Sequence, residues 1–137
     1  GGYETRNRYF KGCIAPKDIT LRRIRDGPTN DVAVFEGFID YLSALKLGII
    51  QGMDAIILNS VSNVGKAIPY LRDYNTINCY LDNDNAGKSA FATISDEFGN
   101  VIDRSFLYTW FNDLNEYLTQ SKNAINPISQ QTKISKL

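Results

Sequence analysis

Short apolar runs alternate with helix-like segments along most of this chain. The runs have the length of strands and cover residues 32–35, 55–58, 76–81 and 101–102. The segments between them predict helices over residues 38–47, from residue 62 or 63 to 71, and from residue 84 or 85 to 98, although Pro69 is unfavourable inside the second one. This alternation predicts an α/β fold with a mainly parallel sheet of about four strands, flanked by helices and joined by right-handed crossovers.

The two ends of the chain differ from this alternating region. Residues 9–10 and 19–21 predict short strands around a turn at Ala15-Pro16, and residues 113–118 predict a short helix. The residues from 121 onward are rich in Ser, Gln, Asn and Lys and lack periodicity, which is typical of a linker or a chain end. We therefore divide the chain into a basic lead-in with a short β segment (1–30), an α/β domain (31–120) and a polar tail (121–137).

Carboxylates stand directly behind two of the predicted strands. Glu36 follows the run at 32–35, and Asp82 and Asp84 follow the run at 76–81. The carboxyl ends of parallel strands lie on one edge of the sheet, which is where open α/β folds bind ligands. Carboxylates that converge there repel one another unless a cation lies between them, and oxygen ligands with an open coordination sphere suit Mg²⁺. The pattern therefore predicts a site for Mg²⁺ or Mn²⁺.

The composition restricts the chemistry that is open to this chain. Its 137 residues include no histidine, which excludes a Ser-His-Asp triad, a Cys-His pair and zinc sites with the usual histidine ligands. The two cysteines, Cys13 and Cys79, are far apart, and we expect both to be reduced in a cytoplasmic protein. No apolar run approaches the roughly 20 residues that a membrane span needs, so we expect no membrane partner.

The net charge is zero, but the charges are unevenly distributed. Residues 1–25 hold seven basic and two acidic residues, residues 26–118 hold five basic and thirteen acidic ones, and the tail holds three lysines and no acid. A basic segment beside an acidic domain favours a polyanion held next to a metal site; the alternative is a basic surface that is only solvated. The candidate contacts with nucleic acid are Arg6, Arg8, Lys11 and Lys88.

Three segments resemble motifs of the toprim family. Residues 34–40 (Val-Phe-Glu-Gly-Phe-Ile-Asp), with Ser43-Ala44, look like its first motif, and residues 81–87 (Leu-Asp-Asn-Asp-Asn-Ala-Gly) look like its second. Residues 112–116 (Asn-Asp-Leu-Asn-Glu) resemble a segment that follows in bacterial replicative primases. The resemblance covers about residues 30–118 and implies the toprim fold, an acidic Mg²⁺ site and chemistry on phosphodiester bonds.

The resemblance also implies roles for individual residues. It makes Asp82 and Asp84 metal ligands, and Glu36 either a further ligand or the general acid/base. Asp113 matches the first acid of the third motif and would hold a second metal. We expect supporting roles beside these ligands for Gly37, Asp40, Asn59, Ser60, Gly87 and Asn115.

The resemblance is strongest to bacterial primases and to primase-like proteins of mobile elements, which share the basic lead-in at residues 6–12. Two departures concern the third motif, where primases carry a lysine and an aspartate in place of Asn112 and Asn115. We expect a weaker second metal site, or none, as a consequence. Primases also carry a zinc-binding domain ahead of the toprim core, so we expect this sequence to be a fragment or a reduced homologue.

The expected function is therefore that of a Mg²⁺-dependent toprim domain of a DNA primase-like protein. As part of a longer enzyme it would perform nucleotidyl transfer, making RNA primers from nucleotides on a DNA template, with a helicase or another replication protein as a further partner. One alternative is a non-catalytic toprim module that binds nucleic acid or a partner in a replication or mobilisation protein. Another is a fragment of a toprim nuclease or topoisomerase.

Overall fold

The computed structural model describes residues 18–121 of the chain. The elements in chain order are β1 (Thr20–Arg22), β2 (Asp31–Phe35), α1 (Phe38–Leu47), β3 (Asp54–Ile57), the 3₁₀ turn η1 (Val61–Asn63), α2 (Val64–Leu71), β4 (Thr76–Tyr80), α3 (Asn85–Glu97), β5 (Val101–Asp103) and the 3₁₀ turn η2 (Ser105–Tyr108). Residues 114–121 are helical as well. The predicted alternation of strands and helices is confirmed, and the predicted strand ends differ from the observed ones by one residue.

The strands form one sheet in the order β1-β3-β2-β4-β5. The pairs β2·β3, β2·β4 and β4·β5 are parallel, whereas β1 runs antiparallel to β3, with Thr20 opposite Ile57. The mainly parallel α/β fold is therefore confirmed. The strand predicted at residues 19–21 joins the sheet as β1 and makes it five-stranded. The strand predicted at residues 9–10 lies outside the described residues.

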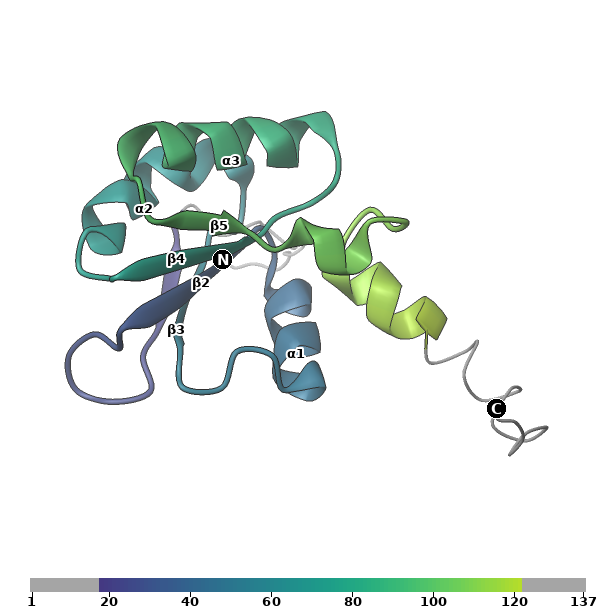
Figure 1. Ribbon diagram of the computed structural model, residues 1–137, viewed down its shortest axis with the longest axis horizontal. Helices are drawn as coiled ribbons and strands as arrows, with labels where there is room; N and C mark the ends of the chain where they lie inside the picture. The colour runs from purple at the N-terminus through teal and green to yellow at the C-terminus, as the bar shows by residue number, and fades with distance from the viewer. Residues whose placement is uncertain (1–17, 122–137) are drawn as a thin grey trace, which may run out of the picture.

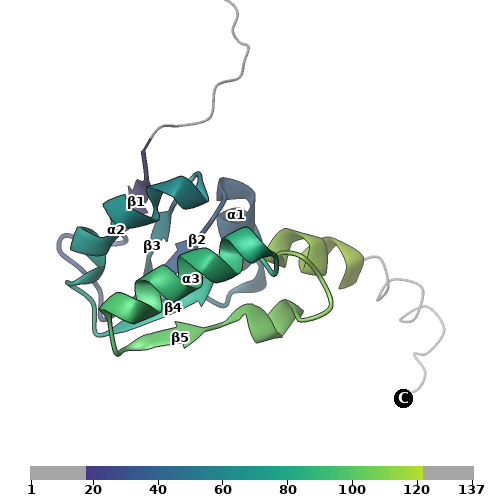
Figure 2. The same cartoon turned by 90° about the horizontal axis from the view of Figure 1, so that it is seen from above.

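Helices cover both faces of the sheet. In Figure 1, α2 and α3 lie on one face, and α1 lies on the other. Figure 2 shows α2 and α3 together over the strands. Successive residues of a strand point to opposite faces, so β2 directs Val32 and Val34 into the core beneath α2 and α3, and Ala33 and Phe35 into the core beside α1. Burial on both faces explains why the central strands are continuous apolar runs.

The helix ends follow from local chemistry. Gly48 ends α1 in the left-handed conformation (φ +73°), and its N–H donates to the carbonyls of Ala44 and Leu45. Pro69 lies inside α2. The residues directly before α2 form the 3₁₀ turn η1, so the α-helix begins at Val64. No helix within residues 18–121 is long and apolar enough to cross a membrane.

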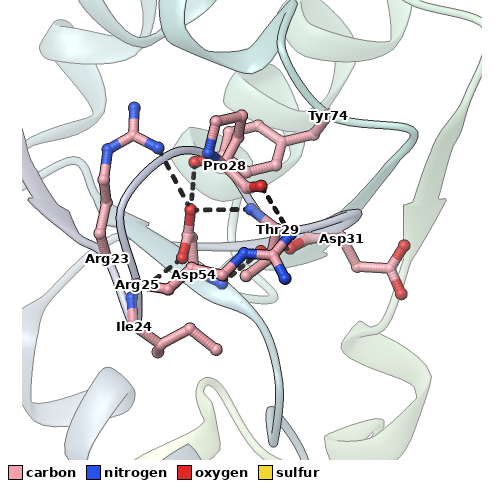
Figure 3. A network of polar contacts seen from close by, with 8 residues as sticks. All are labelled: Arg23, Ile24, Arg25, Pro28, Thr29, Asp31, Asp54 and Tyr74. Carbon is pink, nitrogen blue, oxygen red and sulfur yellow. Dashed lines mark hydrogen bonds and ion pairs between the residues drawn. The ribbon is translucent and has the colours of Figure 1, made fainter.

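Asp54 is fully buried at the amino end of β3 and has hydrogen-bond partners on both oxygens (Figure 3). Its Oδ1 accepts from the N–H of Ile24 at 3.1 Å, and its Oδ2 accepts from the N–H of Thr29 at 3.3 Å. Oδ2 also accepts from the hydroxyl of Tyr74 at 2.7 Å and lies 3.5 Å from the guanidinium of Arg23. Asp54 therefore ties the loop between β1 and β2, and the chain before β4, to the amino end of β3.

Candidate metal centre

The parallel neighbours β2 and β4 bring Glu36 and Asp82 together at their carboxyl ends. Glu36 directly follows β2, and Asp82 lies two residues beyond β4. The Glu36 Oε2 accepts a hydrogen bond from the N–H of Asp82 at 2.8 Å. Both residues are half-buried, so this bond fixes the glutamate against the turn that leads into α3.

Asp84 completes a first group of carboxylates. It is the N-cap of α3, and its Oδ1 accepts from the N–H of Gly87 at 2.8 Å. One oxygen from each of Glu36, Asp82 and Asp84 lies within 4.8 Å of the others. Capping and metal binding are compatible here, because the cap uses one of the two carboxylate oxygens.

A second group shares Asp82 with the first. It consists of Asp40, Asp82 and Asp113, with one oxygen of each within 4.8 Å of the others. Asp40 lies on α1 and is only 7% exposed; its Oδ1 accepts from the N–H of Asn115 at 3.1 Å. Asp113 caps the helix at 114–121, because its Oδ1 accepts from the N–H of Glu116 at 2.8 Å. Together the two groups make Asp82 the common member of one acidic centre.

The electrostatics of Asp82 fit a cation. Its Oδ1 is buried and has no hydrogen-bond partner among the described residues. Burial, followed by the neighbouring Glu36 carboxylate, raises the pKa of Asp82 to about 8. Burial likewise raises the pKa of Glu36 and raises that of Asp40 to about 6. A centre of carboxylate oxygens with an unpartnered acceptor has the donor set that Mg²⁺ and Mn²⁺ prefer.

Two glycines were expected beside the ligands, and their surroundings differ. Gly87 is buried, and a Cβ added to it would lie 2.8 Å from both the Glu36 Oε2 and the carbonyl carbon of Asp82. Only glycine therefore allows α3 to approach the acidic residues this closely. Gly37 is the N-cap of α1, and an added Cβ there would meet no atom within 4 Å.

The polar residues expected beside the ligands act mostly through other groups. The N–H of Asn59 donates to the carbonyl of Glu36 at 2.8 Å, but its side chain donates to the Asp18 carbonyl and the Thr20 hydroxyl, toward β1. The hydroxyl of Ser60 accepts from the N–H of Ser62. Asn115 is closer to the expectation, because its N–H bonds Asp40 and its Oδ1 accepts from the hydroxyl of Ser43 at 3.2 Å.

Asn83, between the two aspartates, has a role that the sequence reasoning missed. Its N–H donates to the carbonyl of Asn112 at 2.6 Å, and its Nδ2 donates to the carbonyls of Tyr108 and Phe111 at 3.0 and 2.9 Å. These three bonds hold the segment at 108–112 against the centre and so place Asp113. The signal in the sequence is a third polar residue, between two acids, directly after a buried strand.

The structure places one of the four basic candidates. Lys88 is exposed on the first turn of α3, and its N–H donates to the carbonyl of Asp84 at 2.9 Å. Arg6, Arg8 and Lys11 lie outside the described residues, as does Cys13. The predicted contact between the basic lead-in and nucleic acid therefore stays a prediction.

Known proteins give independent comparisons. A family model described as Toprim-like matches residues 33–118. The crystal structure of the primase fragment of the bacteriophage T7 primase-helicase protein has a TM-score of 0.54 and 21% identity, and the match covers 75% of this chain and 44% of that one. At that identity, the likeness concerns the fold.

A second T7 structure contains a lagging-strand DNA polymerase interacting with primase domains bound to an RNA/DNA hybrid and dTTP. It matches with a TM-score of 0.46 and 21% identity, covering 58% of this chain and 43% of that one. The present chain thus spans less than half the length of either T7 chain. No curated protein matches it.

Proposed function

Because this chain belongs to the Toprim-like family, we propose that it is the metal-binding core of a DNA primase-like protein that makes RNA primers on a DNA template. The observation that carries the proposal is the buried, unpartnered Oδ1 of Asp82 at the junction of two carboxylate groups. A buried acceptor without a donor costs stability unless a ligand satisfies it. The fold that the chain shares with the T7 primase fragment supports the choice of a primase.

Each of the two groups of carboxylates would hold one metal ion. Glu36, Asp82 and Asp84 would hold one ion, and Asp40, Asp82 and Asp113 a second. When bound, such ions neutralise phosphate charge and align a 3′-hydroxyl with the α-phosphorus in nucleotidyl transfer. Glu36 also orients Asp82, because the Glu36 Oε2 accepts a hydrogen bond from the backbone N–H of Asp82.

Asp40 compensates for the missing carboxylate at Asn115. The primase motif places an aspartate where this chain has an asparagine, and the second site loses one negative charge there. Asp40 returns a carboxylate to that site from α1, and the N–H of Asn115 holds it in place. The second site accordingly keeps three carboxylates, so we propose two metals rather than one.

Charge supports the choice of substrate. Lys88 lies one helical turn beyond Asp84, where its ammonium can reach a phosphate held by the metal centre. The basic lead-in would bind the template backbone of DNA, and the nucleotides are the second substrate. A helicase or another replication protein completes the proposed set of partners.

Metal binding and primer synthesis by the full-length protein test the proposal in two steps. Mn²⁺ binding is followed by calorimetry, and primers are detected on a single-stranded template, for the wild type, Asp82→Asn and the control Asp96→Asn on the exposed side of α3. We expect both signals in the wild type and in the control, and neither in Asp82→Asn. Metal binding without primers would favour the non-catalytic binding module, and primers from Asp82→Asn would contradict the proposed centre.

A further inference from the structure

Helix α1 presents apolar side chains to solvent on the side that faces away from the core. Its buried residues are Asp40, Tyr41, Ser43 and Ala44. The large apolar residues on its outward side are 43–58% exposed: Phe38, Ile39, Leu42 and Leu45. These are four of the nine exposed large apolar residues in the part of the chain that the structure describes, although α1 has only ten residues. Apolar residues gathered in one place on a surface mark an interaction site.

The helix α3, on the other face of the sheet, differs from α1 in this respect. Its exposed residues are asparagine, alanine, lysine, serine, threonine, aspartate and glutamate, and none of them is large and apolar. This is the ordinary pattern of a helix with one side in the core and one side in water. A helix that is apolar on all sides is instead typical of a helix that is buried on all sides, so the outward side of α1 has the composition of an interface.

The exposed positions of α1 are symmetric about Leu42. Ile39 and Leu45 lie three residues to either side of it, and Phe38 and the exposed Lys46 lie four residues to either side. Residues three and four apart share one helix face, so these five residues form a single strip with Leu42 at its centre. A two-fold axis that passes through Leu42, perpendicular to the helix, brings this strip against an identical strip in the opposite direction. Such self-complementarity is what a symmetric dimer requires of its interface.

We propose that two copies of this chain associate through α1, with the two helices packed antiparallel about a two-fold axis at Leu42. Leu42 then meets Leu42 of the second copy on the axis. Phe38 packs on Leu45 of the second copy, and Ile39 packs on the aliphatic part of its Lys46, whose ammonium group stays in water. In this arrangement the partly negative C-terminal end of each helix lies beside the partly positive N-terminal end of the other.

The proposed dimer does not depend on the proposed function, because no metal ligand takes part in it. Asp40, the acidic residue that α1 contributes to the metal centre, lies on the buried side of the helix, where its Oδ1 accepts from the N–H of Asn115. The contact is also small, since a helix of ten residues is only about 15 Å long. It buries less than the roughly 1,600 Å² of a standard stable interface, so we expect a dissociation constant between about 1 µM and 1 mM.

Sedimentation equilibrium of the 137-residue chain over this range of concentration measures the association. We expect the mass of the wild type to rise from that of one chain toward that of two. Leu42→Glu brings two carboxylates together on the axis and should raise the dissociation constant about 30-fold or more, the effect of a residue at the centre of an interface. The control is Tyr70→Glu, which changes an exposed aromatic residue on α2 and should dimerise like the wild type.

A disulfide on the proposed axis gives a second measurement, which does not rely on the folding of Leu42→Glu. In a Cys13→Ser background, Leu42→Cys places one thiol of each copy on the axis. Antiparallel helices about 8–10 Å apart allow the Cβ separation of roughly 3.8 Å that a disulfide needs. Cys79 is buried and does not compete. We expect a disulfide-linked dimer on mild oxidation of Leu42→Cys, and none with the control Tyr70→Cys.

Three outcomes would overturn the proposal. A wild type that stays monomeric at every concentration would mean that another segment covers the outward side of α1, such as residues 122–137 or a further part of a longer protein. A dimer that persists in a folded Leu42→Glu variant would place the interface elsewhere on the molecule. Equal oxidation of Leu42→Cys and Tyr70→Cys would indicate random collision instead of a specific contact.

Discussion

Asp54 is fully buried and Asp82 buries one carboxylate oxygen, and they lie at opposite ends of the parallel strands of one sheet, in opposite surroundings. Asp54, at the amino end of β3, is surrounded by donors: two backbone N–H groups, the Tyr74 hydroxyl and the Arg23 guanidinium. Asp82, beyond the carboxyl end of β4, has carboxylates as neighbours and one oxygen without a partner. A buried charge that is fully hydrogen-bonded supports the fold, whereas one left unsatisfied indicates a site that awaits a ligand.

Replacing Asp54 should give the largest effect on stability. In Asp54→Asn, an amide NH₂ group faces N–H and O–H donors that formerly met an oxygen, and the charge opposite Arg23 is lost. We expect the free energy of unfolding to fall by about 2–4 kcal/mol, measured in urea. The control is Asp73→Asn, an exposed neighbour of Tyr74. A loss within the ~0.5 kcal/mol of ordinary surface changes would remove the contrast with Asp82.

Gly87→Ala tests how tightly α3 packs on the acidic centre. The added methyl group would collide with the main chain of Asp82 and the carboxylate of Glu36, so we expect a loss of about 1–3 kcal/mol together with weaker Mg²⁺ binding. Gly65→Ala in α2 is the matched control, because its Cβ would meet open space. That control should gain about 0.5–1 kcal/mol from helix propensity. Equal effects of the two substitutions would contradict the close approach at Gly87.

Asp82→Asn combined with Asp84→Asn tests the acidic centre, the second region of the comparison with Asp54. Without metal, we expect this variant to be as stable as the wild type or slightly more stable, because repulsion falls while asparagine still caps α3. Mg²⁺ at 10 to 100 times its dissociation constant should stabilise the wild type by about 1.4–2.7 kcal/mol and leave the variant unchanged. The measurement is the melting temperature with and without Mg²⁺. A wild type indifferent to Mg²⁺, with a variant that melts lower, would assign these aspartates to the fold instead.

Asp82 also introduces a pH dependence of stability. Its pKa rises from an ordinary value of 3.8 to about 8 in the metal-free fold, mainly through burial. A folded pKa above the unfolded one means that the folded protein holds the proton more tightly. The contribution of Asp82 to the free energy of unfolding is therefore fully present below the unfolded pKa and is lost as the pH rises through the folded pKa. The melting temperature of the metal-free wild type should therefore fall relative to Asp82→Asn across this range. Parallel curves for the two proteins would mean that Asp82 ionises normally.

The nearness of Glu36, Asp82 and Asp84 could be predicted because it depends only on where two parallel strands end. Parallel strands end on one edge, and the residue after each strand is read directly from the apolar pattern. Asp40 as a member of the second group could not be predicted in this way, because its position depends on how α1 packs against the sheet. Asn83 acts through carbonyls 25 to 29 residues away, which no local pattern encodes.

The Asp54 network and Asn59 show the same limit. Asp54 joins groups 20 to 31 residues away along the chain, whereas the apolar pattern identifies it only as the polar residue before a strand. Asn59 was expected beside the metal ligands. Its side chain instead donates to Thr20 of β1, and its backbone is left-handed (φ +66°). Asparagine permits this backbone state but does not require it, so the sequence could not predict it.

The brevity of β1 and β5 has a consequence for self-association. These two strands form the edges of the sheet in the part of the chain that the structure describes, and each has three residues. A strand this short exposes few unpaired N–H and C=O groups, so it is a poor template for a strand of another molecule. The long apolar strands β2 and β4, which would aggregate readily at an edge, lie inside the sheet. The strand order thus protects a concentrated solution of this domain against edge-to-edge aggregation.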